Sequence, residues 1–338
     1  MRPNNYQNLL TIIIPAYNAK KTLLRCIKSL TTQKRNLIEI IIVDDNSQDG
    51  SNSLYIKYKK IFKKEEIKII NLKKNQGPGY CRNVGIKNST GKYITFLDSD
   101  DYYINNGLEK IINILQKNNP DILINNNLRN KKPFLNDFFF KNFKKKKYKK
   151  NEYYNISNKY GLNLNECWKI VIKKNIIKKN QIKFPEIYIG EDQCFVYDCI
   201  LKSRAFFVNK DPVIYHYSSI SGLSSSNLSE MTKSFIYLLY FFYKKRLKNL
   251  LEKKFISKKI NYLTENLNIT LLNQNDYKIG NLLNRLDNIY LSKKHKLNKP
   301  FLKNKIFNST KRLKERINFF LKNKKTENYK IYIFSKNF

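Results

Sequence analysis

Short apolar runs alternate with helix-period stretches over the first 125 residues. Five runs bounded by glycine, proline or polar residues are typical of buried strands: residues 10–14, 38–43, 67–70, 93–97 and 122–124. Between them, apolar residues recur at helical spacing, predicting helices over 20–32, over the stretch that carries Leu54, Tyr58 and Ile61, and over the stretch from Leu108 to Leu115. This alternation predicts an α/β fold on a mostly parallel sheet, with right-handed crossovers and helices on both faces.

The pattern changes after residue 125. Residues 125–165 are rich in asparagine and lysine, and we interpret them as an insertion or mobile segment. Order returns at Trp168, for which a core position is favoured over a substrate contact. A helix beginning after Gly190 and strands at 205–208 and 213–215 complete the predicted domain, which we place at residues 1–222.

Residues 223–338 form a basic region of a different kind. From Ser221 to the end the chain has 26 Lys and Arg against 7 Asp and Glu. Aromatic and aliphatic residues interleave with the cations at 235–251 and 306–321, which predicts basic amphipathic helices. Such helices can lie in a membrane interface or pack an apolar stripe on the core, and both alternatives stay open.

The formal net charge of the 338 residues is +40. Nucleic acid, an anionic membrane surface and an AT-rich coding bias that fills the surface with lysine would each account for it. No recognised nucleic-acid motif accompanies the charge. The five cysteines form no Cys-x-x-Cys pair or zinc spacing, which indicates a reducing compartment. We expect no signal peptide and no membrane-spanning helix.

Carboxylates follow two of the predicted strands. Asp45 comes after the strand at 38–43, and Asp98 and Asp100 come after the strand at 93–97. Ligands of open parallel sheets bind beyond the carboxyl ends of the strands. Two close carboxylates repel each other unless a cation lies between them, and Mg²⁺ or Mn²⁺ on such oxygens can neutralise a diphosphate. The alternative is an acidic turn that caps the next helix.

Two further stretches suggest anion binding and acid–base chemistry. Arg82 follows a Gly-Pro-Gly turn at a predicted helix start, which is a favourable anion site, or else an ordinary turn. Glu191 and Asp192 open another helix, where acidic residues also simply complement the helix dipole. The first strand is not followed by Gly-x-Gly-x-x-Gly, and there is no Walker loop, which disfavours dinucleotide oxidoreductases and ATPases.

Together these pieces resemble one family, the GT-A-fold glycosyltransferases of family 2. The resemblance covers residues 8–222 and rests on five segments in register: 13–18 (IIPAYN), 43–49 (VDDNSQD), 77–83 (GPGYCRN), 91–101 (GKYITFLDSDD) and 190–192 (GED). It implies a nucleotide-diphosphate sugar as donor, commonly a UDP-sugar, and a divalent cation, Mn²⁺ or Mg²⁺.

The resemblance also implies roles for individual residues. Those for the donor are Pro15, Ala16 and Tyr17 lining the nucleotide pocket, Asp45 on the base, Arg82 near the nucleotide or diphosphate and Asp98 on the ribose or the metal. Those for metal and catalysis are Asp100 as metal ligand, His216 as a further candidate at the metal or diphosphate, and Asp192 as catalytic base with Glu191 beside it.

We therefore expect an inverting transferase that adds a sugar to a hydroxyl of a growing glycan, such as lipooligosaccharide, capsule or a lipid-linked oligosaccharide. The basic tail favours a cytoplasmic enzyme on the inner face of the membrane, bound to anionic lipid and to no specific nucleic acid. Two alternatives stay open: a basic nucleic-acid-binding protein, and an inactive transferase fold that serves as an interaction module. The sequence sets no oligomeric state.

Overall fold

A computed structural model describes most of the chain between residues 8 and 274. The described ranges exclude residues 33, 52–53, 55–66, 130–131, 134–139, 141, 145, 161–163, 188, 218–233, 236, 240, 243–244, 246 and 248–249. Most of the predicted helix around Leu54, with Tyr58 and Ile61, and the whole predicted helix at 306–321 lie outside the described residues.

The described elements follow the alternation that the sequence predicts. In chain order they are β1 (Leu10–Ala16), α1 (Leu23–Lys28), η1 (Arg35–Leu37), β2 (Ile38–Asp44), β3 (Ile67–Asn71), α3 (Gly77–Asn88), β4 (Tyr93–Phe96), β5 (Tyr102–Tyr103), α4 (Gly107–Asn118), β6 (Ile122–Arg129), β7 (Lys132–Pro133), β8 (Lys147–Lys149), α6 (Lys150–Tyr160), η2 (Cys167–Lys169), β9 (Ile170–Lys173), α7 (Lys174–Asn180), α8 (Glu191–Lys202), β10 (Ala205–His216) and α10 (Leu250–Gln274).

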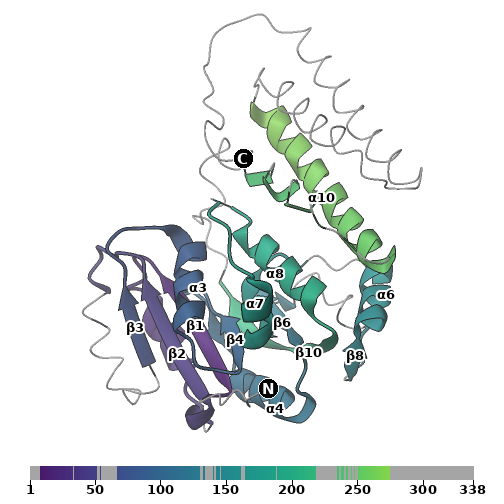
Figure 1. Cartoon of the computed structure of the whole chain (residues 1–338). Helices are drawn as coiled ribbons and strands as arrows, with labels where there is room; N and C mark the ends of the chain where they lie inside the picture. The colour runs from purple at the N-terminus through teal and green to yellow at the C-terminus, as the bar shows by residue number, and fades with distance from the viewer. Residues whose placement is uncertain are drawn as a thin grey trace, which may run out of the picture. The chain divides into compact units, whose positions relative to one another are not determined.

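One mixed sheet organises these elements (Figure 1). Its order is β3-β2-β1-β4-β9-β6-β10-β5, with β7 beside β6 and β8 beside β10. The pairs among β3, β2, β1 and β4 are parallel, and so is the pair of β6 with β10. Only β9 runs against its two neighbours in this central part. The prediction of a mostly parallel α/β sheet is confirmed.

Alternate residues of each central strand face opposite helical layers. Ile12 and Ile14 of β1 belong to an apolar cluster with residues of α1 and α4, such as Ile27 and Ile111. The opposite face packs against α3 and α8. Phe96 of β4 there meets the rings of Phe184 and Phe195 edge-on, at centroid distances of 5.2 and 5.3 Å.

Glycine sets how closely α3 approaches the sheet. A Cβ on Gly85 would lie 2.3 Å from Cγ2 of Ile13 in β1. No side chain fits at that distance without moving strand or helix. The close contact fixes the height of α3 over β1, and α3 carries Arg82.

The segment predicted as an insertion contains regular structure. Its first five residues complete β6, and it also holds β8 and α6. Asn125 and Asn127 are buried because β6 is a central strand between β9 and β10. The Asn209 amide donates to Oδ1 of Asn125 at 3.4 Å. Residues 125–129 are therefore strand, and the expectation of a loop there is corrected.

Two other bounds differ from the prediction. α1 spans Leu23–Lys28, shorter than 20–32, and the Ser29 hydroxyl donates to the Cys26 carbonyl at its end. The predicted strands at 205–208 and 213–215 are one strand, β10, whose register shifts between Asn209 and Ile214. The irregularity accommodates Pro212 inside a strand.

The chain divides into two compact units. The first comprises Met1–Asn227 together with Lys245–Lys259, and the second comprises Leu228–Lys244 with Ile260–Phe338. The first unit extends beyond the predicted boundary at residue 222 and takes in the beginning of α10. In the second, Leu238, Phe242 and Leu263 are buried. Within the described residues, every helix is too short or too polar to cross a lipid bilayer.

Candidate active site

Strand ends bring the predicted site residues to one edge of the sheet. β1, β2 and β4 are parallel, so Ala16 at the end of β1 lies at the same edge as Asp45 and Asp98, which follow β2 and β4. The Asp45 amide donates to the Ala16 carbonyl at 2.8 Å. This edge is where ligands of open α/β sheets bind.

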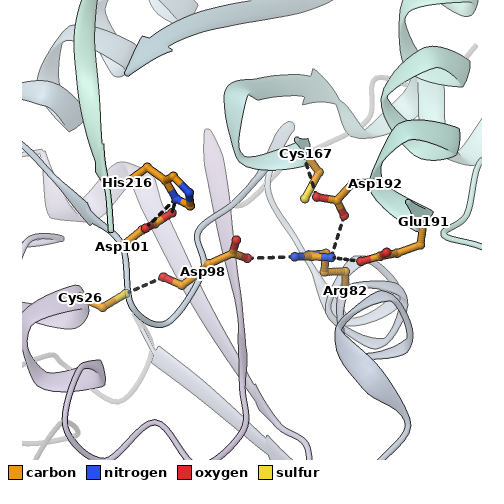
Figure 2. Close-up of polar contacts among 8 residues, drawn as sticks. All are labelled: Cys26, Arg82, Asp98, Asp101, Cys167, Glu191, Asp192 and His216. Atoms are coloured by element: carbon orange, nitrogen blue, oxygen red, sulfur yellow. Dashed lines mark hydrogen bonds and ion pairs between the residues drawn. The ribbon is translucent and has the colours of Figure 1, made fainter. Parts of the chain in front are cut away.

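Arg82 joins three carboxylates at this edge (Figure 2). Its Nη1 lies 2.9 Å from Oε1 of Glu191 and 2.7 Å from Oδ1 of Asp192, while Nη2 lies 2.9 Å from Oδ1 of Asp98. The guanidinium is buried. One cation thus ties α3, the loop after β4 and the start of α8 together, with an excess of negative charge around it.

Burial and charge act in opposite directions on the two central groups. Burial would lower the pKa of Arg82, but the charge of Asp192 and its neighbours raises it well above its usual range. Burial raises the pKa of Asp192, and the charges of Glu191 and Asp98 raise it further, whereas Arg82 and the Cys167 amide lower it. Asp192 is therefore a more basic carboxylate than an exposed aspartate.

The loop after β4 is held by its own backbone and by α1. The Asp101 amide donates to the Asp98 carbonyl at 3.0 Å, and the Arg25 guanidinium donates to the Asp100 carbonyl at 2.9 Å. Arg25 also lies over the rings of Tyr102 and Tyr217. With the main chain fixed in this way, the carboxylates of Asp98 and Asp100 project from a rigid turn.

Asp101, directly before β5, binds His216 at the end of the neighbouring strand β10. Its carboxylate is wholly buried, lies 3.0 Å from the Nδ1 of His216 through either oxygen, and accepts the Tyr217 amide at 2.8 Å. The His216 ring stacks on Trp168 at a centroid distance of 5.0 Å. Burial alone would lower the pKa of His216, but the hydrogen bond and charge of Asp101 raise it. The Nδ1 of His216 is thus occupied by Asp101, so a ligand of this imidazole would have to bind Nε2.

The residues expected at the nucleotide form a separate group. Pro15 and Ala16 are buried at the end of β1, whereas Tyr17 is 52% exposed beside them. The Asp45 carboxylate accepts the backbone amides of Gln76 and Gly77, both at 2.8 Å. Asp45 therefore fixes the start of α3 in this structure, a task that the sequence did not predict for it.

The predicted metal ligands Asp98, Asp100 and His216 offer oxygen and nitrogen atoms to a divalent cation. Asp98 and Asp100 offer hard oxygens, and burial together with the charge of Asp98 raises the pKa of Asp100, a repulsion that a cation would relieve. Across the described ranges, no group of three His, Cys, Asp or Glu side chains is arranged to hold a metal ion. Asp98, Asp100 and His216 carry donor atoms of the types that Mn²⁺ or Mg²⁺ binds, although their side chains are not grouped around one point in this structure.

The structure brings most of the predicted residues together in two groups. One surrounds Arg82, and the other comprises Pro15, Ala16, Tyr17 and Asp45. Arg82 contacts Asp98, Glu191 and Asp192 directly. His216 contacts Asp101, and the charges of Asp98 and Asp100 help to raise its pKa. Arg82, expected at the nucleotide or diphosphate, is bound to carboxylates. Asp101 was missed as a functional residue, although it ends the same acidic run. Trp168 is buried as predicted, but one face of it supports His216.

Comparison with known proteins identifies the family of the chain. The family described as Glycosyl transferase family 2 matches residues 11–179, half of the chain. The poly(ribitol-phosphate) beta-N-acetylglucosaminyltransferase TarP of Staphylococcus aureus (strain N315) is 31% identical over 231 residues, which are 66% of each chain. The matched segments span between 18% and 66% of the first three curated relatives.

Two solved structures share the fold. Residues 1–349 of S. aureus TarS, in complex with UDP-GlcNAc, superpose with a TM-score of 0.61 at 21% identity, covering 75% of this chain and 73% of that one. The mannosyltransferase PcManGT of Pyrobaculum calidifontis, in complex with GDP-Man and Mn²⁺, gives a TM-score of 0.56 at 12% identity, covering 94% and 85%. At these identities the likeness establishes the fold.

Proposed function

The chain belongs to glycosyl transferase family 2, and on that premise we propose that it moves a sugar from a nucleotide-diphosphate sugar to a hydroxyl of a growing glycan. The observation that carries the proposal is the meeting of Asp98, Glu191 and Asp192 on the buried Arg82 at the carboxyl edge of the sheet. Retention of this whole set argues against the alternative of an inactive fold.

In this proposal Asp192 is the catalytic base. Its carboxylate accepts hydrogen bonds from Arg82 and from the Cys167 amide, so its orientation is fixed. Its raised pKa suits the removal of a proton from an acceptor hydroxyl near neutral pH. Because a single displacement with one base inverts the anomeric carbon, we propose an inverting reaction, with Glu191 holding Arg82 in place beside it.

The donor is proposed to be a UDP-sugar. One support is the UDP-GlcNAc bound by TarS. The other is the position of Pro15, Ala16 and Tyr17 at the end of β1, beside Asp45 at the end of β2. PcManGT of the same fold binds GDP-Man, so GDP-sugars belong in the same test. TarP is named for transfer to poly(ribitol-phosphate), which supports a growing polymer as the acceptor class.

In this proposal Asp98, Asp100 and His216 would hold a divalent cation, and the Mn²⁺ in the PcManGT complex supports the need for a cation rather than the choice of these residues. A bound Mn²⁺ or Mg²⁺ supplies positive charge for the leaving diphosphate. The chain's own contribution is to orient these side chains: Arg25 fixes the main chain at Asp100, and Asp101 holds the His216 ring.

Nucleotide release from a panel of donors tests the proposal. Purified protein is incubated with UDP-, GDP- and dTDP-sugars and Mn²⁺ or Mg²⁺, and free nucleotide is quantified beside Asp100→Ala. We expect metal-dependent release from one donor and at least a ~10²-fold loss in the variant, because the variant removes charge stabilisation at the leaving group. No release with any donor, together with no metal-dependent UDP binding by calorimetry, would refute the proposal.

A second part of the proposal concerns the membrane. The basic composition beyond residue 221 motivates a cytoplasmic enzyme held at the inner membrane face by anionic lipid. The test is flotation of the full chain with vesicles of phosphatidylglycerol or of phosphatidylcholine. Equal partitioning into both kinds of vesicle would contradict membrane attachment through anionic lipid.

A nucleic-acid-binding protein remains the second candidate function, and only the net charge supports it. Sequence- or structure-selective binding of nucleic acid would be needed to support this function.

A further inference from the structure

Residues 245–259 are packed into the first compact unit, although the sequence places them in the basic tail. The Lys245 ammonium forms an ion pair with Asp198 of α8. Farther along, Glu252 pairs with Lys150 of α6 at 2.5 Å. These ionic contacts tie the segment to two helices of the catalytic unit, one of which begins with Glu191 and Asp192.

An aromatic contact reinforces the ion pairs. The Phe255 ring lies between Tyr154 of α6 and Tyr197 of α8, at centroid distances of 5.1 and 5.3 Å. The Asn158 amide donates to the Leu251 carbonyl at 3.1 Å. The first turns of α10 therefore hold α6 and α8 against each other.

Lys259 reaches farther, toward the loop before η2. The side chain is buried, with 2% exposed, and Nζ lies 2.5 Å from Oδ1 of Asn165. Burial lowers the pKa of Lys259 to about 7, and the charge of Glu166 opposes that shift. A lysine is rarely buried this completely unless its charged group is paired, and here Asn165 and the Tyr197 ring at 5.4 Å contact it.

The same loop, residues 164–167, also contacts the proposed base Asp192. The Glu166 carboxylate accepts the Asn165 amide at 3.2 Å and pairs with the buried Lys169 at 2.9 Å. The Cys167 amide then donates to Oδ2 of Asp192 at 3.2 Å. A continuous set of contacts thus runs from α10 through residues 165–167 to the carboxylate opposite Arg82.

We propose that Lys259 is a positioning residue for Asp192, so that the beginning of the basic tail is part of the catalytic machinery. The inference rests on the proposed function of Asp192 as base. Lys259 acts by holding the loop whose Cys167 amide orients the carboxylate. Misplacement of a catalytic group by about 1 Å can cost ~10²-fold in rate, so loss of this brace should be visible in turnover.

The test uses the full chain with Lys259→Met and Asn165→Leu, singly and combined. We expect kcat to fall about tenfold or more in each single variant, with KM for the donor and the UDP dissociation constant unchanged. The double variant should lose less than the two single losses combined, because both substitutions remove the contact between Lys259 and Asn165, while the contact of Lys259 with the Tyr197 ring is lost only with Lys259→Met. Lys254→Met, at an exposed site on the same helix, is the matched control and should keep the wild-type kcat.

Amide hydrogen exchange gives a readout that does not require turnover. Exchange across residues 164–169 should be faster in Lys259→Met and in Asn165→Leu than in Lys254→Met. Wild-type exchange and wild-type kcat in both variants would overturn the inference. A wild-type enzyme that turns over no donor refutes the proposed function instead, and exchange alone then decides whether Lys259 holds the loop. A fall in melting temperature with kcat unchanged also overturns it, since packing alone predicts that result.

Discussion

The environment of Asp192 determines the pH at which the proposed base can work. Burial, with the charges of Glu191 and Asp98, raises its pKa above that of an ordinary aspartate. A protonated Asp192 cannot accept the acceptor's proton. We therefore expect kcat/KM to rise with pH on the acidic side and to level off well above the value of ~3.9 for unperturbed aspartate.

The measurement is a pH profile of kcat/KM for wild type and for His216→Gln. The acidic limb should persist in His216→Gln at a lower overall rate, because the limb belongs to Asp192. A profile that is already flat from about pH 5 upward would contradict the assignment, since an exposed carboxylate is fully ionised there. If the pH dependence on the acidic side disappeared in His216→Gln, the titrating group would be the His216 imidazole and not Asp192.

Residue chemistry at the site was predictable where it follows strand ends. Asp98 and Asp100 follow β4 at the expected edge of the sheet, whereas Asp192 lies in the first turn of α8, where a helix start was predicted. The ion pairs of Arg82 were not predictable, because Asp98 and Asp192 are far from it in sequence and meet it only through the sheet order. The contact of Asp101 with His216 spans 115 positions for the same reason.

At the scale of elements, the closest contact between helix and strand is at Gly85. Gly85→Ala puts a methyl group 2.3 Å from Cγ2 of Ile13, so α3 or β1 must move. We expect a loss of ~1–3 kcal/mol in the free energy of unfolding, even though alanine is the better helix former. Thermal or urea unfolding measures it, with Lys87→Ala at an exposed position of the same helix as control.

A stability of Gly85→Ala equal to wild type would show that α3 sits higher over the sheet than described. Because α3 also carries Arg82, a shift of the helix should lower activity beyond the loss of stability. The Gly-Pro-Gly turn predicted the start of this helix but not its distance from the sheet, since a turn motif says nothing about the space available for a side chain.

Element prediction failed where polar residues occupy a central strand. Asn125 and Asn127 lower the hydrophobicity of β6 and make its second half resemble a loop. Their amides are buried between neighbouring strands, and Asn209 of β10 bonds one of them. A pattern of apolar residues cannot show that a polar side chain will find its partner on another strand.

At the scale of the whole molecule, the compact units differ from the predicted division between a domain at 1–222 and a basic region at 223–338. Composition changes near residue 221, but Lys245 to Lys259 return to the first unit. Lysines there bind Asp198 and Asn165 as well as adding to the net charge of +40. A charge count does not distinguish a buried lysine from one that faces a membrane.

The most direct test of the account is transfer by Asp192→Asn. Once the panel of donors has shown which nucleotide sugar and which cation the wild type uses, the variant is assayed with them for sugar transfer. Its UDP binding is measured by calorimetry. We predict at least a ~10²-fold fall in kcat with the UDP dissociation constant and melting temperature unchanged, because asparagine keeps the shape but cannot take a proton. Wild-type transfer by Asp192→Asn would contradict the central claim that this carboxylate is the base.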